Sequence, residues 1–308
     1  MSFDTEKNYC ILGFPESQED ASELAKLLDF PYATIAIHRF PDGESKVTLP
    51  AKLLKSHSRP IIFRSLDRPN EKLIELILAA DGAKQLGAVS LTLIAPYLAY
   101  MRQDKAFNPG EVVSQKIIGD LLASRFDAVL TIDSHLHRIL KLSQAIPTTL
   151  AINLSATHPM AAFLKAQLDQ PFLLGPDEES QQWVEAIAQH DRMDFAIASK
   201  QRKGDREVVI ELPVANYQGR DVVLVDDMAS SGQTLIQAAR ELKRYKPKSI
   251  SVLVTHALFK DGSVAQLQAE GVTNIWSCNS VNHASNALSL IPLLAENIKC
   301  SLTQATGV

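Results

Sequence analysis

Short runs of β-branched and aliphatic residues alternate with longer amphipathic segments along almost the whole chain. In the longer segments apolar residues recur at spacings of three and four, as on one face of a helix. The short runs have the length and composition of buried strands. Strands are predicted at residues 33–38, 60–64, 89–95, 128–133, 149–153, 172–175, 195–199, 222–226, 250–255 and 273–276, and helices at 70–86, 112–124, 156–168, 180–190, 234–245 and 262–270.

This alternation is typical of mostly parallel sheets flanked by helices, so the predicted fold class is α/β. A similar order occurs twice: VSLTLIAPYLAYMRQD, a helix and DAVLTIDSH in the first half, then RDVVLVDDMASSGQT, a helix and SISVLVTH in the second. In each copy the later strand ends in a histidine, His135 or His256. The repeat predicts two related halves, 1–147 and 148–287, with the boundary where Pro147 interrupts the periodicity.

Two segments lie outside this simple repeat. Residues 200–219, KQRKGDREVVIELPVANYQG, have a charged, glycine-containing centre next to a short alternating strand, which predicts a hairpin or mobile flap. A last helix within residues 288–308 is expected to return and pack on the first half.

Composition excludes several classes of protein. The 308 residues are 46% hydrophobic and 21% charged with a net charge of -4, which is ordinary for a globular protein of two domains. No lysine- or arginine-rich run suggests nucleic acid or a membrane surface, and no apolar run approaches the roughly 20 residues of a membrane span. We therefore expect a cytoplasmic protein. Cys10, Cys278 and Cys300 are widely separated, so neither disulfides nor a cysteine zinc site is expected.

The stretch VVLVDDMASSGQTL carries the clearest chemical signal. Asp226 and Asp227 end a predicted buried strand, where ligands bind in doubly wound sheets, and their carboxylates can accept hydrogen bonds from two vicinal hydroxyls. Hydroxyls and backbone N–H groups at the start of the following helix suit a phosphate. Together they predict a sugar-phosphate site; the alternative is that Ser231 only caps the helix. The phosphate-binding residues would be Ser230, Ser231, Gly232 and Thr234.

DDMASSGQT also resembles the ribose-phosphate-binding loop of the phosphoribosyltransferase fold. Other motifs occur in the order found in ribose-phosphate diphosphokinases: FPDGES at 40–45, PYLAYMRQDK at 96–105, DSH at 133–135, GPDEES at 175–180 and SKQR at 199–202. The resemblance extends from about Phe40 to His256 and is closer to the archaeal-type branch of that family.

The resemblance implies two similar phosphoribosyltransferase-type domains, the first binding ATP and the second ribose 5-phosphate. The implied reaction moves the diphosphoryl group of ATP to the C1 hydroxyl of ribose 5-phosphate and releases AMP. It also implies a homo-oligomer, a dimer or hexamer, with the nucleotide site at a subunit interface. Implied nucleotide-binding residues are Phe40, Asp42, Glu44, Arg102, Gln103 and Asp104, where those of the FPDGES motif contact a neighbouring subunit's nucleotide.

The remaining motifs imply roles in charge stabilisation. His135 and Asp177 would help to bind Mg2+, and Lys200 and Arg202 would stabilise the transferring and leaving oxygens. Asp226 and Asp227 would orient the ribose. A zinc pair of His135 and His137 is disfavoured because no further ligand cluster is evident.

The chain departs from the family pattern directly after Pro176-Asp177, within GPDEES. Glu179 and Ser180 stand where paired glycines are usual, which would narrow the polyphosphate site or repel its charge. This departure leaves open a catalytically silent nucleotide-binding partner of a synthetase. The ribose-phosphate-binding loop also leaves open a phosphoribosyltransferase that consumes the diphosphate.

Overall fold

A computed structural model of the chain describes residues 8–136, 138–203 and 207–306, with side chains described except at 201–209 and 302–306. The chain forms two compact units. The first runs to Leu154 and includes the segment from Ile291 onward, and the second is Ser155–Leu290.

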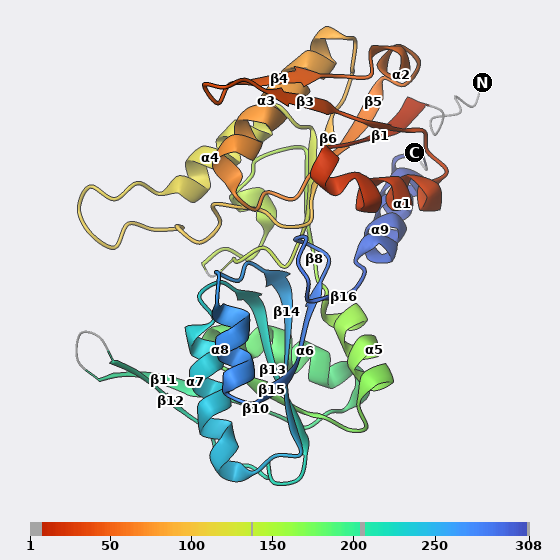
Figure 1. The fold of residues 1–308 in the computed structure, drawn as a ribbon. Helices are drawn as coiled ribbons and strands as arrows, with labels where there is room; N and C mark the ends of the chain where they lie inside the picture. Colours follow the sequence, from red (N-terminus) through yellow and green to blue (C-terminus); the bar gives the residue numbers. More distant parts are fainter. Residues whose placement is uncertain (1–7, 137, 204–206, 307–308) are drawn as a thin grey trace. The chain divides into compact units, whose positions relative to one another are not determined.

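The first unit is built on a six-stranded sheet in which every neighbouring pair is parallel. Its strands pair in the order β2-β1-β5-β6-β7-β8 (Figure 1). Apolar runs such as IIF in β5 are buried on both faces, as expected for strands covered by helices. The strands are β1 (Tyr9–Gly13), β2 (Tyr32–Thr34), β5 (Arg59–Phe63), β6 (Thr92–Ala95), β7 (Ala128–Ile132) and β8 (Leu150–Leu154).

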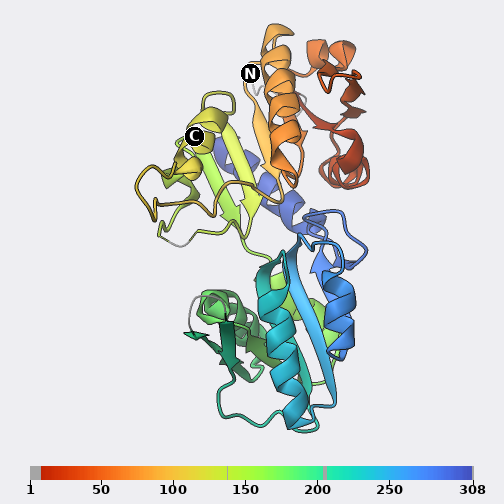
Figure 2. The same ribbon diagram turned by 60° about the vertical axis from the view of Figure 1, so that its left-hand side comes forward.

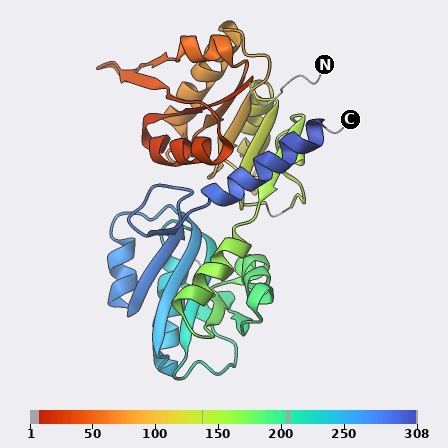
Figure 3. The same cartoon turned by 90° about the vertical axis from the view of Figure 1, so that its right-hand side faces the viewer.

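Helices of the first unit come from both ends of the chain. The C-terminal helix α9 lies beside α1, so the end of the chain belongs to this unit (Figure 3). The helices are α1 (Gln18–Leu28), α2 (Ala51–Ser56), α3 (Pro69–Gln85), α4 (Ser114–Ala123) and α9 (Ile291–Thr306).

The second unit has a second six-stranded parallel sheet, in the order β10-β9-β13-β14-β15-β16. Helices α5 and α6 pack together, as do α7 and α8, and the two pairs cover opposite faces of the sheet (Figures 2 and 3). The strands are β9 (Phe172–Gly175), β10 (Phe195–Ile197), β13 (Asp221–Ala229), β14 (Ser249–Ala257), β15 (Val272–Cys278) and β16 (Asn286–Leu288), and the helices are α5 (Thr157–Gln167), α6 (Gln181–Asp191), α7 (Gln233–Leu242) and α8 (Ser263–Ala269).

The two units share one topology. Numbered within its own unit, each sheet has the strand order 2-1-3-4-5-6, and each unit inserts an antiparallel hairpin between its second and third strands. These hairpins are β3 (Ala36–Arg39) with β4 (Ser45–Thr48), and β11 (Ser199–Lys203) with β12 (Glu207–Glu211). The predicted α/β class, the internal repeat and a hairpin starting near residue 200 are confirmed.

The register of the predicted repeat is wrong by one strand. The sequence comparison matched β6 with β13, whereas the sheet order makes β5 the counterpart of β13 and β6 that of β14. His135 follows the fifth strand of its sheet, while His256 lies in the fourth strand of the other, so the two are not equivalent. Successive strand–helix units look alike in composition, and a match on pattern alone can therefore slip by one unit.

Several elements near the N-terminus were not predicted. Strand β1, in the interior of the first sheet, and helix α1 were missed, and the strand predicted at 33–38 is divided between β2 and β3. The helical signal of α1 was present, because Ala21, Leu24, Ala25 and Leu28 are buried at spacings of three and four. Among the described residues, no helix is sufficiently long and apolar to span a membrane.

Gly119 in α4 supplies a test of this packing. A Cβ at Gly119 would lie only 1.8 Å from the backbone oxygen of Ala145, so Gly119→Ala must displace the main chain. We expect it to lower the free energy of unfolding by about 3 kcal/mol.

A matched variant is Gly82→Ala in α3, where the nearest atom is the end of the flexible Leu49 side chain at 3.0 Å. Its effect should stay within about 1 kcal/mol because alanine also improves helix propensity. Urea denaturation measures both variants, and equal stabilities would contradict the packing at Gly119.

Candidate active site

Residues far apart in sequence meet at the carboxyl edge of the second sheet. Strands β10, β9 and β13 are neighbours there. Lys200 stands at the start of the β11–β12 hairpin just after β10, Asp177 follows β9 by two residues, and Asp226 lies near the end of β13. Because parallel strands all end at the same edge, this order brings a cation and several carboxylates into one region.

The loop after β13 presents an uncapped helix start. Helix α7 begins at Gln233, and Gly232 occupies the N-cap with φ 68° and no side-chain cap. Gly232, and not Ser231 as in the predicted alternative, occupies the N-cap position, although the Gln233 N–H donates a long hydrogen bond of 3.5 Å to Ser231 Oγ. Uncapped N–H groups at the positive end of a helix dipole favour an anion.

Neighbouring backbone contacts hold this loop in place. The Lys260 N–H donates to the Ser230 carbonyl at 2.9 Å, and Ser263 Oγ donates to the Ser231 carbonyl at 3.0 Å. The backbone at position 232 has a left-handed φ, a conformation that favours glycine. The loop carbonyls are thus engaged elsewhere, and the described Ser231 side chain is exposed.

The carboxylates at this edge are poorly compensated. Burial raises the pKa of Asp226 well above its ordinary value, and the nearby charges of Asp227 and Asp177 raise it further. The Asp227 N–H donates to Asp226 Oδ1 at 2.9 Å and offsets only part of this effect. Perturbed acids at a strand edge are typical of binding or catalytic sites.

Lys200 is a counter-ion for this group. Its Nζ lies 3.6 Å from Asp177 Oδ2, and its side chain is 39% exposed. Burial raises the pKa of Asp177, Lys200 opposes that rise, and Glu179 adds to it. The side chain of Arg202, predicted to act with Lys200, lies outside the described residues.

Ser180 does not face the edge of the sheet. It is fully buried, and its Oγ donates to the Asp177 carbonyl at 2.6 Å. Gly175 leaves room for this contact, because a Cβ there would come within 2.4 Å of Ser180 Oγ. Glu179 and Ser180 stand where the family usually has two glycines. Of these two residues, only Glu179 changes the charge near Asp177.

In the first unit the predicted nucleotide residues follow two adjacent strands. Arg102, Gln103 and Asp104 lie in the loop after β6, and His135 lies just after β7. The loop holding His135 is ordered by Ser134, whose N–H and Oγ both donate to Asn153 Oδ1, at 2.9 and 2.8 Å. His137 lies outside the described residues.

Asp104 has a structural partner that was not predicted. Its side chain is only 3% exposed, and its Oδ1 accepts a hydrogen bond from Arg138 at 2.5 Å. Its Oδ2 is buried without a hydrogen-bond partner among the described residues. Asp104 thereby draws Arg138, whose side chain is 47% exposed, toward the loop after β6.

Phe40, Asp42 and Glu44 lie together at the tip of the β3–β4 hairpin, which extends away from the first sheet (Figures 1 and 3). Phe40 is 42% exposed and packs edge-on against His38 with ring centroids 4.9 Å apart. Hydrogen bonds between Phe40 and Glu44 and between Gly43 and Phe40 close the tip. An exposed aromatic ring beside two acids is suited to contacting a nucleobase.

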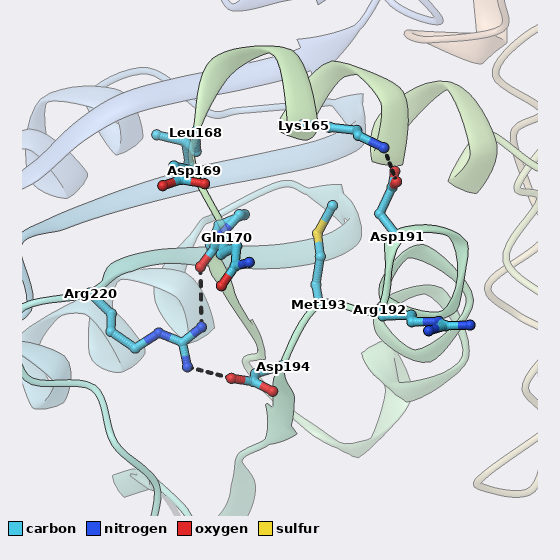
Figure 4. Close-up of a pocket in the computed structure, with 10 residues that line it drawn as sticks. Lys165, Leu168, Asp169, Gln170, Asp191, Arg192, Met193, Asp194 and Arg220 are labelled. Carbon is cyan, nitrogen blue, oxygen red and sulfur yellow. Dashed lines mark hydrogen bonds and ion pairs between the residues drawn. The ribbon is translucent and has the colours of Figure 1, made fainter.

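The second unit contains a cavity of about 360 Å³, whose lining residues are drawn in Figure 4. It is lined by residues just before β9, β10 and β13, at the opposite edge of the second sheet. Its lysine and one arginine are already paired: Lys165 with Asp191 at 2.5 Å and Arg220 with Asp194 at 2.6 Å. Two of the charged side chains that line this cavity are thus engaged in ion pairs, and the cavity lies at the edge of the second sheet opposite Asp177 and Asp226.

Among the described residues, no group of three or more His, Cys, Asp or Glu side chains is arranged to hold a metal ion alone. Mg2+ usually takes only one or two protein carboxylates together with water and substrate phosphates. The raised pKa values of Asp177 and Asp226 fit acids whose charge a substrate-borne cation would relieve.

The fold and site define a chain with two phosphoribosyltransferase-type units. Residues 9–125 match the family model described as the N-terminal domain of ribose phosphate pyrophosphokinase. Residues 151–290 match the phosphoribosyl transferase domain.

Curated relatives extend this match over nearly the whole chain. The ribose-phosphate pyrophosphokinase of Methanopyrus kandleri is 31% identical over 292 residues, covering 94% of this chain and 98% of the relative. That of Methanosarcina acetivorans is 32% identical over 291 residues, covering 94% and 99%. The chain belongs to the ribose-phosphate pyrophosphokinase family.

A solved structure supports the same fold. The crystal structure of phosphoribosylpyrophosphate synthetase from Mycobacterium smegmatis matches with a TM-score of 0.81 at 22% identity. The match covers 97% of this chain and 100% of that one. Both units and the returning C-terminal helix are therefore parts of one shared architecture.

The pKa of Asp226 leads to a stability prediction. Since folding raises this pKa, the ionised carboxylate destabilises the folded protein once the pH exceeds its ordinary value of 3.8. Asp226→Asn should raise the unfolding temperature at pH 8 by roughly 2–4 °C, and the gain should disappear as the pH falls toward 4.

Asp221, at the start of the same strand, is a suitable control because its pKa is shifted in the opposite direction. Burial would raise its pKa, but Lys248 at 2.8 Å and Ser249 at 2.6 Å outweigh burial and lower it. The ionised Asp221 therefore stabilises the folded protein, and Asp221→Asn should lower the unfolding temperature at pH 8. Calorimetry at several pH values measures both variants; a fall for Asp226→Asn at pH 8 would contradict the description of the site.

Proposed function

We propose that the chain transfers the β,γ-diphosphoryl group of ATP to the C1 hydroxyl of ribose 5-phosphate, giving 5-phosphoribosyl 1-diphosphate and AMP. The C1 oxygen forms a bond to the β-phosphorus, the bond from that phosphorus to the α,β-bridging oxygen breaks, and the hydroxyl proton is released. The observation that carries this proposal is the convergence of Lys200, Asp177 and Asp226 with an uncapped helix start, in a chain similar to pyrophosphokinases over almost its full length.

For ribose 5-phosphate, the proposed residues lie in and after β13. Asp226 and Asp227 accept hydrogen bonds from the ribose hydroxyls. The 5-phosphate binds at the start of α7, where the N-cap residue Gly232 supplies no side-chain cap. The phosphate-binding residues are Ser230, Ser231, Gly232 and Thr234.

For ATP, the proposed residues lie in the first unit. Arg102 binds the polyphosphate, because a guanidinium matches pairs of anionic oxygens, and Gln103 lies on the adenine side. Asp104 contributes through the position of Arg138. Phe40, Asp42 and Glu44 contact the base of a nucleotide bound by a neighbouring subunit, so the protein acts as a homo-oligomer, a dimer or hexamer.

His135 in the first unit and Asp177 in the second are proposed to help to hold Mg2+. When bound, the ion neutralises phosphate charge during the transfer. Lys200 and Arg202 stabilise the negative charge on the transferring and leaving oxygens. Positioning and electrostatics account for the acceleration, since phosphoryl transfer requires little covalent chemistry from the protein.

The competing functions have less support. A phosphoribosyltransferase reading leaves the first unit and its RQDK and DSH motifs unexplained. A silent regulatory partner was suggested by Glu179 and Ser180, yet Ser180 is buried with its hydroxyl bonded to the Asp177 carbonyl, and Asp177 keeps an ion pair with Lys200.

The function is tested by mixing the purified protein with Mg-ATP and ribose 5-phosphate and recording phosphorus NMR spectra. We expect AMP and a C1-linked diphosphate to form together at catalytic turnover. ATP binding without turnover would instead favour the regulatory partner, and consumption of added phosphoribosyl diphosphate with a nucleobase would favour a phosphoribosyltransferase.

Lys200→Ala tests the proposed catalytic role. Loss of this cation should lower kcat by about 10²–10³-fold, the usual effect of removing one charge-stabilising group. Lys165→Ala is a matched control because Lys165 is also exposed and ion-paired to an aspartate of the same unit. Steady-state kinetics should show nearly unchanged turnover for the control, and full turnover by Lys200→Ala would disprove the role of Lys200.

A further inference from the structure

A buried pair of opposite charges lies between the first sheet and its hairpin. The side chains of Arg64, directly after β5, and Glu75, in α3, are each only 1% exposed. Arg64 donates to Glu75 Oε2 at 2.5 Å. Replacing a buried ion pair with apolar residues often leaves stability unchanged or improves it, so stability alone gives little reason for this pair.

The second oxygen of Glu75 connects to the hairpin. Glu75 Oε1 accepts hydrogen bonds from Ser45 Oγ at 2.8 Å and from Arg39 Nε at 3.3 Å. Arg39 and Ser45 are paired with each other in the β3–β4 register, and they are the last pair before the tip at residues 40–44. One carboxylate oxygen therefore binds both strands where the tip begins.

Arg64, the partner of Glu75, is itself held by several contacts. Arg64 also donates to Glu16 Oε1 at 2.7 Å and to the Lys72 carbonyl at 3.0 Å, and its guanidinium lies 3.7 Å from the centre of the Phe14 ring. These contacts leave the guanidinium little freedom, and through it Glu75 is tied to the sheet. Burial alone would raise the pKa of Glu75, but hydrogen bonds from Arg64 and Ser45 and the charges of Arg64 and Arg39 lower it, so the carboxylate is ionised.

We propose that Glu75 is a positioning residue for nucleotide recognition, which fixes the base of the β3–β4 hairpin through Arg39 and Ser45 and so orients Phe40, Asp42 and Glu44. This inference rests on the proposed function, in which the hairpin tip contacts the nucleobase. The tip is closed by its own hydrogen bonds, and its direction is determined by where its two strands are attached. A rigid attachment lowers the entropy lost when the tip binds a base.

The test detaches the hairpin without leaving a buried charge unpaired. Arg39→Met/Ser45→Ala removes both hydrogen bonds from the hairpin to Glu75 and leaves Arg64–Glu75 intact. The exposed contact of Arg39 with Glu71, at 3.2 Å, is lost as well but contributes little. Lys46→Met/Thr48→Ala is the matched control: it removes a cation and a hydroxyl from β4, and neither residue is a partner of Glu75 among the described side chains.

In the test variant, KM for ATP should rise by about 5–10-fold, the loss expected for two hydrogen bonds of modest net strength. KM for ribose 5-phosphate and kcat should change less than about twofold. The ratio of kcat/KM for ATP to that for GTP, measured first on the wild type, should move toward one, since only base recognition is loosened. Hydrogen exchange in peptides from residues 36–48 should accelerate, whereas the control should match the wild type in every measurement.

The outcomes separate the two proposals. A wild-type protein without turnover would overturn the proposed function and the positioning role with it. An active wild type whose Arg39→Met/Ser45→Ala variant keeps its KM for ATP and its nucleotide preference would overturn the positioning role alone. Equal losses of ATP and ribose 5-phosphate binding would also overturn it, because they would indicate a general structural defect.

Discussion

The structure depends on one constraint of all-parallel sheets: helices cover both faces, so the carboxyl edge is where polar side chains can meet a ligand. In the second unit this edge gathers Asp177, Asp226 and the start of α7 from β9 and β13, which are neighbours in the sheet but separated by about fifty residues in sequence. In the first unit it gathers the loop of Arg102 and the loop of His135 from β6 and β7. In both units the proposed substrate-binding residues thus lie at the carboxyl edge of a parallel sheet.

The shared topology places a hairpin at the same point in each unit, between the second and third strands. The two hairpins carry different chemistry. In the first unit the tip displays Phe40 with two acids, whereas in the second the first strand of the hairpin carries Lys200, 3.6 Å from Asp177. An insertion at one topological position can acquire a new role without disturbing the sheet, since the strand order around it is kept.

The sequence was sufficient for features that depend on local pattern. Alternating strands and helices indicated α/β units, and VVLVDDMASSGQTL indicated a strand followed by a helix start, because both signals lie within short windows. Features that depend on distant partners were not predicted. Nothing near Asp104 in sequence indicates its contact with Arg138, and the contacts of Arg64 and Glu75 join residues 16, 39, 45, 64 and 75. A charge next to apolar residues, directly after a strand at IIFR and within a helix at LIEL, was the available signal for the buried pair.

Glu75 in the first unit and Asp226 in the second are acids whose pKa values are shifted in opposite directions, and this difference helps to distinguish a structural role from a ligand-binding role. Glu75 accepts hydrogen bonds at both oxygens, and its pKa is lowered, so its ionised form is stabilised by the fold itself. Asp226 has a raised pKa and acidic neighbours, so its ionised form is left for a ligand to stabilise. A buried charge whose partners are all supplied by the fold suits a structural role, whereas an acid with a raised pKa is typical of a functional site. This difference agrees with the proposed roles, in which Glu75 would position the β3–β4 hairpin and Asp226 would bind the ribose hydroxyls.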